Sequence, residues 1–256
     1  MFQYIDTHVH YSDQAFGTDW EDCVERAVEK GVGIMIQPDI DSRERESTYA
    51  ISESRPGVLY TMLGLYPGSV DERWEDELAE LDRWWDRGPV AVGEIGLDYH
   101  YGARTAELQK LAFKEQLKMA AARDLPVNIH LRDATEDFFK ILEECSHLGL
   151  RGNLHAFSGS LETFRRLQRY GEWSVGIGGV VTFKNSRLAE TVRDIPLEKI
   201  LLETDAPYLA PVPYRGRRNE SAYIPVIAAK IAEIKGTDPG EVAAVTTANA
   251  LKMFRI

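Results

Sequence analysis

Six side chains that can bind a metal ion lie at or near the ends of short apolar segments. They are His8, His10, Glu94, His130, His155 and Asp205. Imidazole nitrogens and carboxylate oxygens hold ions such as Mg, Mn or Zn while leaving a position open for water. The pattern therefore predicts a hydrolytic centre with one or two divalent metal ions.

The spacing of these residues suggests how they would share the ions. His8 and His10 are two residues apart, so in an extended segment both rings face the same side. Glu94 lies among apolar residues and has two oxygens, which could bridge two cations. Asp205 could bind metal and also take the proton of an attacking water. We therefore name Glu94 and Asp205 as the candidate catalytic residues.

Each of these residues also has an ordinary structural explanation. A single histidine such as His130 or His155 is more often a core residue than a ligand. Glu94 could form an ion pair with Arg or Lys, and Asp205 could cap a turn. The metal hypothesis depends on the repetition of the pattern at five places in the chain.

Short apolar runs alternate with amphipathic segments along the chain, and this order predicts the elements that would position the ligands. The predicted strands are Gln3–His8, Gly33–Gln37, Leu59–Leu65, Val90–Ile95, Val127–Leu131, Gly152–His155, Ser174–Ile177 and Lys199–Glu203. The predicted helices are Trp20–Lys30, Arg43–Glu53, Trp74–Trp85, Thr105–Arg123, Glu136–Cys145, Leu161–Tyr170, Ser186–Arg193, Tyr223–Lys235 and Pro239–Phe254.

Eight alternations of strand and helix predict an α/β fold, a (β/α)₈ TIM barrel formed as a single domain over residues 1–256. An open doubly wound sheet is the alternative, but it would need a glycine-rich phosphate turn after the first strand. His8 to His10 do not form such a turn. Barrel enzymes carry their chemistry at the carboxyl ends of the strands, where the six proposed ligands fall.

Composition limits the classes of protein that fit. Hydrophobic residues make up 44% of 256 residues, and no stretch approaches the length needed to span a bilayer, so we expect a cytoplasmic protein without a membrane partner. Cys23 and Cys145 are the only cysteines and give no support to a disulfide framework. The net charge of -11 excludes binding of nucleic acid through a general positive field, so a polyanion would need a local basic patch and metal.

The motifs that contain the proposed ligands resemble those of the TatD family of metal-dependent deoxyribonucleases, within the amidohydrolase-like metal barrels. The resemblance covers essentially the whole chain. It rests on the segments Asp6–His10, Gly93–Tyr99, Pro126–Ala134, His155–Gly159, Leu202–Leu209 and Pro211–Glu220. It implies that His8, His10, Glu94 and Asp205 hold one divalent cation, and that Glu94, His130 and His155 hold a second. It also implies removal of nucleotides from the 3′ end of single-stranded DNA or RNA.

The chain departs from this family after the third predicted strand. The usual Gly-x-His-Pro-His is replaced by a segment with Tyr66 and Gly68 in place of the two histidines. Those histidines are thought to lie beside the substrate phosphate, so the change weakens the nuclease assignment more than the metal assignment. Tyr66 could stack on a base or donate a hydrogen bond.

A basic loop provides candidate contacts for a phosphate. Arg215, Arg217 and Arg218 could clamp phosphate with help from Lys184 and Arg132, or they could form an ordinary solvated loop. With Tyr66, the candidate substrate contacts are therefore Tyr66, Arg132, Lys184, Arg215 and Arg217.

Three functions follow from these observations. The first is a metal-dependent 3′–5′ exonuclease or phosphodiesterase that acts on single-stranded ends. The second is a metal-dependent hydrolase of a carboxylic ester, amide or lactone, including an aminoacyl ester on tRNA, which the loss of the two histidines favours. The third is a binding or scaffold protein without turnover. The sequence shows no need for an obligate protein partner and does not choose the metal.

Overall fold

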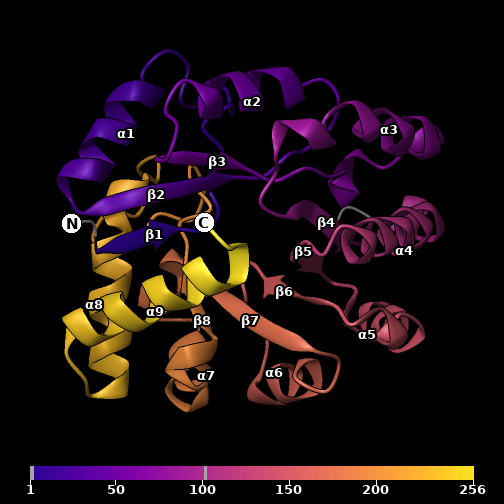
Figure 1. Ribbon diagram of the computed structural model, residues 1–256. Coiled ribbons are helices and arrows are strands. Elements are labelled where there is room, and N and C mark those ends of the chain that lie inside the picture. Colours follow the sequence, from indigo (N-terminus) through magenta and orange to yellow (C-terminus); the bar gives the residue numbers. More distant parts are fainter. Residues whose placement is uncertain (1–2, 101–102) are drawn as a thin grey trace.

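Strands and helices alternate in the computed structural model, which describes residues 3–100 and 103–256. The strands are β1 (Tyr4–Asp6), β2 (Val32–Gln37), β3 (Leu59–Thr61), β4 (Val92–Asp98), β5 (Val127–Arg132), β6 (Arg151–Leu154), β7 (Glu172–Ile177) and β8 (Ile200–Leu202). The α-helices are α1 (Trp20–Glu29), α2 (Arg45–Glu53), α3 (Trp74–Glu80), α4 (Ala106–Ala122), α5 (Thr135–Glu144), α6 (Leu161–Leu167), α7 (Leu188–Asp194), α8 (Ile224–Lys235) and α9 (Pro239–Phe254). Helices surround the strands in Figure 1.

The strands form two parallel sheets that are joined at both seams. Strands β1 to β3 pair in chain order, and so do β4 to β8. Between β3 and β4, Leu63 pairs with Val92. Between β8 and β1, Val9 pairs with Ala206, and Thr7 N donates to Leu202 O at 3.0 Å. The chain therefore has the predicted barrel fold.

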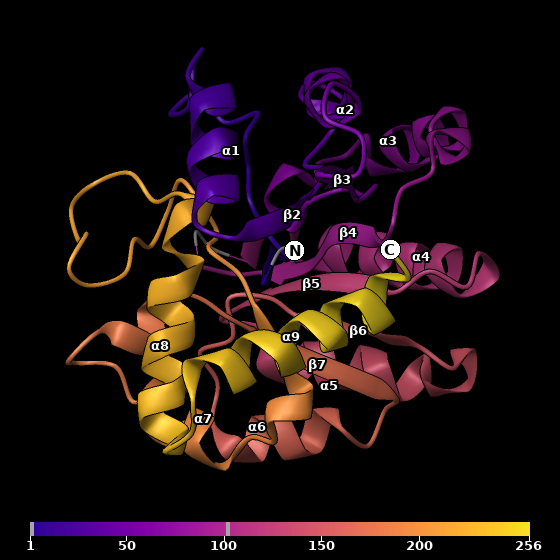
Figure 2. The ribbon, with the colours of Figure 1, turned by 60° about the vertical axis from the view of Figure 1, so that its left-hand side comes forward.

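The last helix covers the end of the barrel where the strands begin. Thr247 Oγ1 in α9 donates to the carbonyl of Gln3, just before β1, and Asn249 donates to Ile200 O at the start of β8. Met253 and Phe254 are buried with apolar side chains of the strands. Figure 2 shows α9 lying across the barrel. The opposite end, where the strands finish, is left to the connecting loops.

Several predicted bounds are wrong in informative ways. The segment predicted as one helix over Trp74–Trp85 is an α-helix only to Glu80, followed by two short 3₁₀ turns. The third strand ends at Thr61 instead of Leu65, although Leu63 still pairs with β4. The fourth strand runs on to Asp98, so Glu94 does not end it.

Glu94 lies in an irregular part of β4. The pairing of β4 with β5 shifts register between Val92 and Ile95. Gly96 has a φ of +139°, and a Cβ there would lie 3.0 Å from the carbonyl carbon of His130. A side chain is therefore excluded at this point, and the two strands that carry Glu94 and His130 approach each other closely.

Within the described residues, no helix has the length and apolar character that a bilayer crossing requires.

Candidate metal centre

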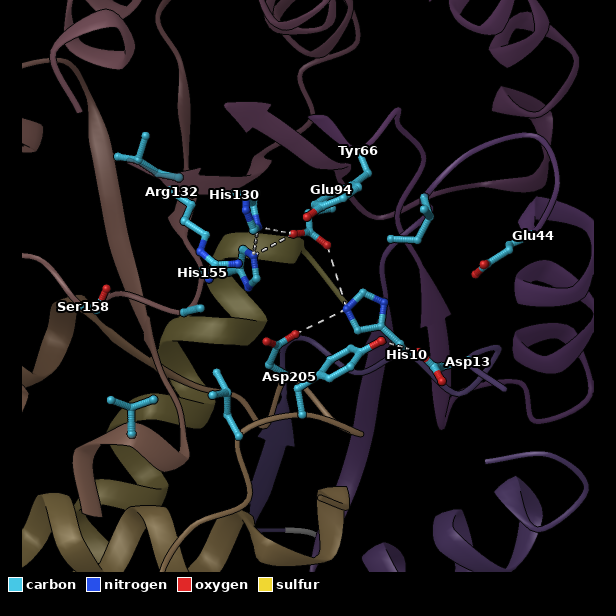
Figure 3. A pocket seen from close by; sticks show the side chains of 16 residues that line it. His10, Asp13, Glu44, Tyr66, Glu94, His130, Arg132, His155, Ser158 and Asp205 are labelled. Atoms are coloured by element: carbon cyan, nitrogen blue, oxygen red, sulfur yellow. Dashed lines mark hydrogen bonds and ion pairs between the residues drawn. The ribbon is translucent and has the colours of Figure 1, made fainter. Parts of the chain in front are cut away.

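The structure brings all six proposed ligands together at the carboxyl end of the barrel. Figure 3 shows five of them, His10, Glu94, His130, His155 and Asp205. His8 and His10 follow β1, and Asp205 follows β8. His8 Nε2 lies 3.0 Å from His10 Nε2 and 3.3 Å from Glu94 Oε2. His10 Nε2 lies 3.4 Å from Asp205 Oδ1. These atoms form a first cluster of possible ligands.

Glu94 also belongs to a second cluster, with His130 and His155. Its Oε1 lies 2.8 Å from His130 Nδ1 and 2.8 Å from His155 Nε2, and these two nitrogens are 3.2 Å apart. Each carboxylate oxygen of Glu94 thus faces a different group of imidazoles. This is the arrangement that a carboxylate bridging two cations requires.

Hydrogen bonds behind the rings turn the lone pairs of two histidines toward the clusters. Asn128 Oδ1 lies 3.0 Å from His8 Nδ1, and Asn128 donates its own amide to Asn153 at 3.1 Å. This holds the proton of His8 on Nδ1 and leaves Nε2 free to bind a cation. Asp98 Oδ2 lies 3.0 Å from His130 Nε2, so Nδ1 of His130 faces the second cluster. Asp98 therefore orients a proposed ligand.

Burial and neighbouring charges prepare the site for cations. Burial and the imidazole of His155 lower the pKa of His8 to about 4, so His8 is neutral at physiological pH. Burial alone would raise the pKa of Glu94, but the surrounding histidines hold it well below its usual range. Burial acts in the same direction on Asp205, but the hydrogen bond with His10 and the nearby charges of His155 and His8 together outweigh it, so the pKa of Asp205 is also lowered. A divalent cation needs neutral imidazoles and ionised carboxylates, so metal binding would displace protons from His10 and His130, whose pKa values the neighbouring carboxylates raise despite burial.

Glu203 is a site residue that the sequence did not reveal. It is fully buried, its Oε1 accepts a hydrogen bond from Ala156 N, and that oxygen lies 3.9 Å from His155 Nδ1. A Cβ at position 176 would collide with its carboxyl group, so Gly176 provides the space. The available signal was a glutamate at the end of the eighth apolar run, two residues before Asp205.

A cavity of about 660 Å³ opens above the two clusters. Tyr66 and Arg132, two of the candidate substrate contacts, line it. Lys184, Arg215 and Arg217 are not among the residues that line it. The guanidinium of Arg215 instead lies over the ring of Phe183, 3.9 Å from its centroid.

Arg218 also has a structural role. Its guanidinium donates to both oxygens of Asp19, to Ala15 O and to Glu220. These bonds tie the loop before α8 to the segment before α1. The guanidinium of Arg218 is therefore engaged in these contacts and does not line the cavity.

Comparison with known proteins agrees with the geometry of the site. The family profile described as TatD related DNase matches residues 5–255. The metal-dependent hydrolase YabD of Bacillus subtilis is 36% identical over 254 residues, which cover 98% of this chain and 99% of that protein. The 3′-5′ ssDNA/RNA exonuclease TatD of Erwinia tasmaniensis is 32% identical over 98% of this chain and 100% of its own length.

A solved structure shows the same fold. The crystal structure of YjjV, a TatD homologue from Escherichia coli, superposes with a TM-score of 0.92 at 31% identity. The match covers 99% of this chain and 98% of that one. The chain belongs to the TatD-related DNase family and is a metal-dependent hydrolase.

Proposed function

We propose that this enzyme is a 3′–5′ exonuclease that removes nucleotides from single-stranded DNA or RNA ends. The observation that carries the proposal is Glu94, whose two oxygens face separate imidazole clusters at the floor of a cavity of about 660 Å³. A pair of cations held in this way suits hydrolysis of a phosphodiester, because both the attacking and the leaving oxygen need stabilisation. The relative from Erwinia tasmaniensis, named as such an exonuclease, supports the same substrate class.

In this proposal the chain's own residues have separate tasks. His8, His10, Glu94 and Asp205 would hold one cation, and Glu94, His130 and His155 would hold the other. Bound cations would neutralise the phosphoryl oxygens and make water a stronger acid near neutral pH.

Asp205 is the proposed proton acceptor. Its side chain is 18% exposed, it lines the cavity, and its lowered pKa keeps it ionised. It can therefore take the proton of the attacking water. Arg132, which lines the same cavity, would contact a phosphate, and Tyr66 would pack against the sugar or base. A cytoplasmic location is part of the same proposal.

A second candidate is hydrolysis of a carboxylic ester, amide or lactone. The observation that favours it is the uncharged wall of the cavity at Tyr66. A histidine at this position could carry a positive charge near a phosphate, whereas a tyrosine cannot. An ester or amide substrate would not need that charge.

The test is degradation of a 5′-labelled single-stranded DNA by protein that has been stripped of metal and then supplied with Mg, Mn or Zn. We expect a metal-dependent ladder that shortens from the 3′ end. Glu94→Gln, which removes the bridging charge with little change of volume, should abolish the ladder. An intact oligonucleotide in the presence of bound metal would contradict the exonuclease proposal and favour the ester or amide substrate.

A further inference from the structure

The cavity above the proposed ligands has two sides of opposite charge. Arg132 lines one side, at the end of β5. Asp13 and Glu44 line the other side, from the loops that follow β1 and β2. Figure 3 shows Arg132 and Asp13 at opposite sides of the ligand cluster, with Glu44 beyond His10. A substrate that fills this cavity must therefore place different groups at its two sides.

Asp13 is held in place at the acidic side. Its Oδ1 accepts a hydrogen bond from Ala15 N at 2.7 Å, and its Oδ2 accepts one from the hydroxyl of Tyr208. Tyr208 also lines the cavity. Each carboxylate oxygen has two lone pairs, so both retain capacity to accept a hydrogen bond from a bound molecule.

Glu44 is the second acid of this side. It directly precedes α2, and within the described part of the chain its carboxylate makes no hydrogen bond or ion pair. Its lone pairs are therefore available to the cavity. Together Asp13 and Glu44 present acceptors and negative charge, and no donor.

These two sides fit the two ends of a terminal nucleotide. A carboxylate accepts hydrogen bonds from sugar hydroxyl groups, whereas it repels a phosphate. A guanidinium prefers the opposite partner, the backbone phosphate that continues the strand. The strand would therefore run over Arg132, with its last sugar against Asp13 and Glu44.

We propose that Asp13 and Glu44 recognise the free 3′-hydroxyl of the substrate and exclude a 3′-phosphate. This inference rests on the proposed exonuclease function and adds the chemistry of the end that it accepts. It also explains why the enzyme would act only at ends, because an internal nucleotide carries a phosphate at the position of the 3′-hydroxyl.

The experiment compares two 5′-labelled single-stranded DNA oligonucleotides of the same sequence, one ending in a 3′-hydroxyl and one in a 3′-phosphate. Degradation with Mn²⁺ gives kcat/KM for each. We expect the wild-type enzyme to prefer the 3′-hydroxyl end by a factor on the order of ten or more. Asp13→Asn and Glu44→Gln should each narrow that ratio, and the double variant should narrow it further.

A matched control and a second readout separate binding from loss of fold. Glu46→Gln removes one charge from α2, but Glu46 does not line the cavity. The ratio of kcat/KM for the two DNA ends should therefore be the same in this variant as in the wild type. Equilibrium binding of both oligonucleotides to the metal-free protein, measured by fluorescence anisotropy, should show the same preference without turnover. If Asp13→Asn fails to fold, the ratio of kcat/KM values measured for Glu44→Gln alone tests the inference. Glu44 is exposed, so its substitution should not disturb folding.

The outcomes for this inference and for the exonuclease proposal differ. Equal rates and equal binding for the two ends would overturn the inference and leave the exonuclease proposal standing. An unchanged ratio in the Glu44→Gln and double variants would also overturn it. Cleavage of neither end by metal-loaded enzyme would overturn both.

Discussion

Tyr66 and Gly68 are coupled by packing, and Gly68→Ala tests that coupling. A Cβ at position 68 would collide with Cε1 of Tyr66 and lie 3.1 Å from Cδ1. The tyrosine ring thus occupies the space that any larger residue at 68 would need. The hydroxyl of Tyr66 also donates to Asp98 Oδ2 at 3.3 Å, the oxygen that holds His130. We therefore expect Gly68→Ala to push the ring away from Asp98.

The size of the effect follows from these two contacts. Overpacking of a close contact costs about 1–3 kcal/mol, and loss of a hydrogen bond to a charged group lies in a similar range of about 1.5–3 kcal/mol. Because Tyr66 is only half-buried and can move, we expect Gly68→Ala to lower the free energy of unfolding by about 1–2 kcal/mol. In a Tyr66→Ala background the same change should cost nothing, because the ring is absent.

The assay is a double-mutant cycle on the metal-free protein, with the free energy of unfolding from urea titration. A coupling energy of about 1–2 kcal/mol between positions 66 and 68 is expected. Tyr66→Phe keeps the ring and removes the hydroxyl, so Gly68→Ala should remain costly in that background. A cost of Gly68→Ala that is the same with and without the ring would refute the packing argument.

Three further predictions test separate parts of the site. Burial alone would lower the pKa of His130, but Asp98 and Glu94 outweigh burial and raise it to about 9. The free energy of unfolding of the metal-free protein should therefore fall by about 3 kcal/mol between pH 6.5 and 9, as the stabilising proton of His130 is lost. Urea titrations of His130→Ala should lack this part of the pH dependence. Steady-state kinetics of Arg132→Ala on single-stranded DNA should show a raised KM. Arg218→Ala should lower the melting temperature and leave KM unchanged. A raised KM for Arg218→Ala and an unchanged KM for Arg132→Ala would instead support the hypothesis that the basic loop binds phosphate. Asp205→Asn should abolish hydrolysis with little change in the circular dichroism melting curve, and full activity of this variant would exclude Asp205 as proton acceptor.

The sequence was sufficient to predict the order of strands and helices and the identity of six side chains that lie together. Both follow from repetition, because five of the eight short apolar runs carry a metal-binding residue at or near the end where barrel strands meet. Glu94 shows the limit of the pattern. Its strand continues to Asp98 and shifts register against β5 between Val92 and Ile95, and such a shift depends on the neighbouring strand.

Other parts of the site could not be predicted because they depend on tertiary contacts. Glu203 lies in the site because Gly176, on the neighbouring strand, provides the space for its carboxyl group. Asp13 and Glu44 lie in loops that follow two different strands, β1 and β2. Their separation along the chain gives no indication that they line the same cavity. The arginines of the basic loop were interpreted as phosphate contacts, but Arg215 packs on Phe183 and Arg218 binds Asp19.

Two cations, held by the six side chains and both contacted by Glu94, would form the metal centre proposed above. The most direct measurement is anomalous scattering from crystals of the protein soaked in Mn²⁺. We expect two peaks, one among His8, His10, Glu94 and Asp205 and one among Glu94, His130 and His155, with Glu94 contacting both. Manganese bound elsewhere in the chain, or two occupied sites that persist unchanged in Glu94→Ala crystals, would contradict it.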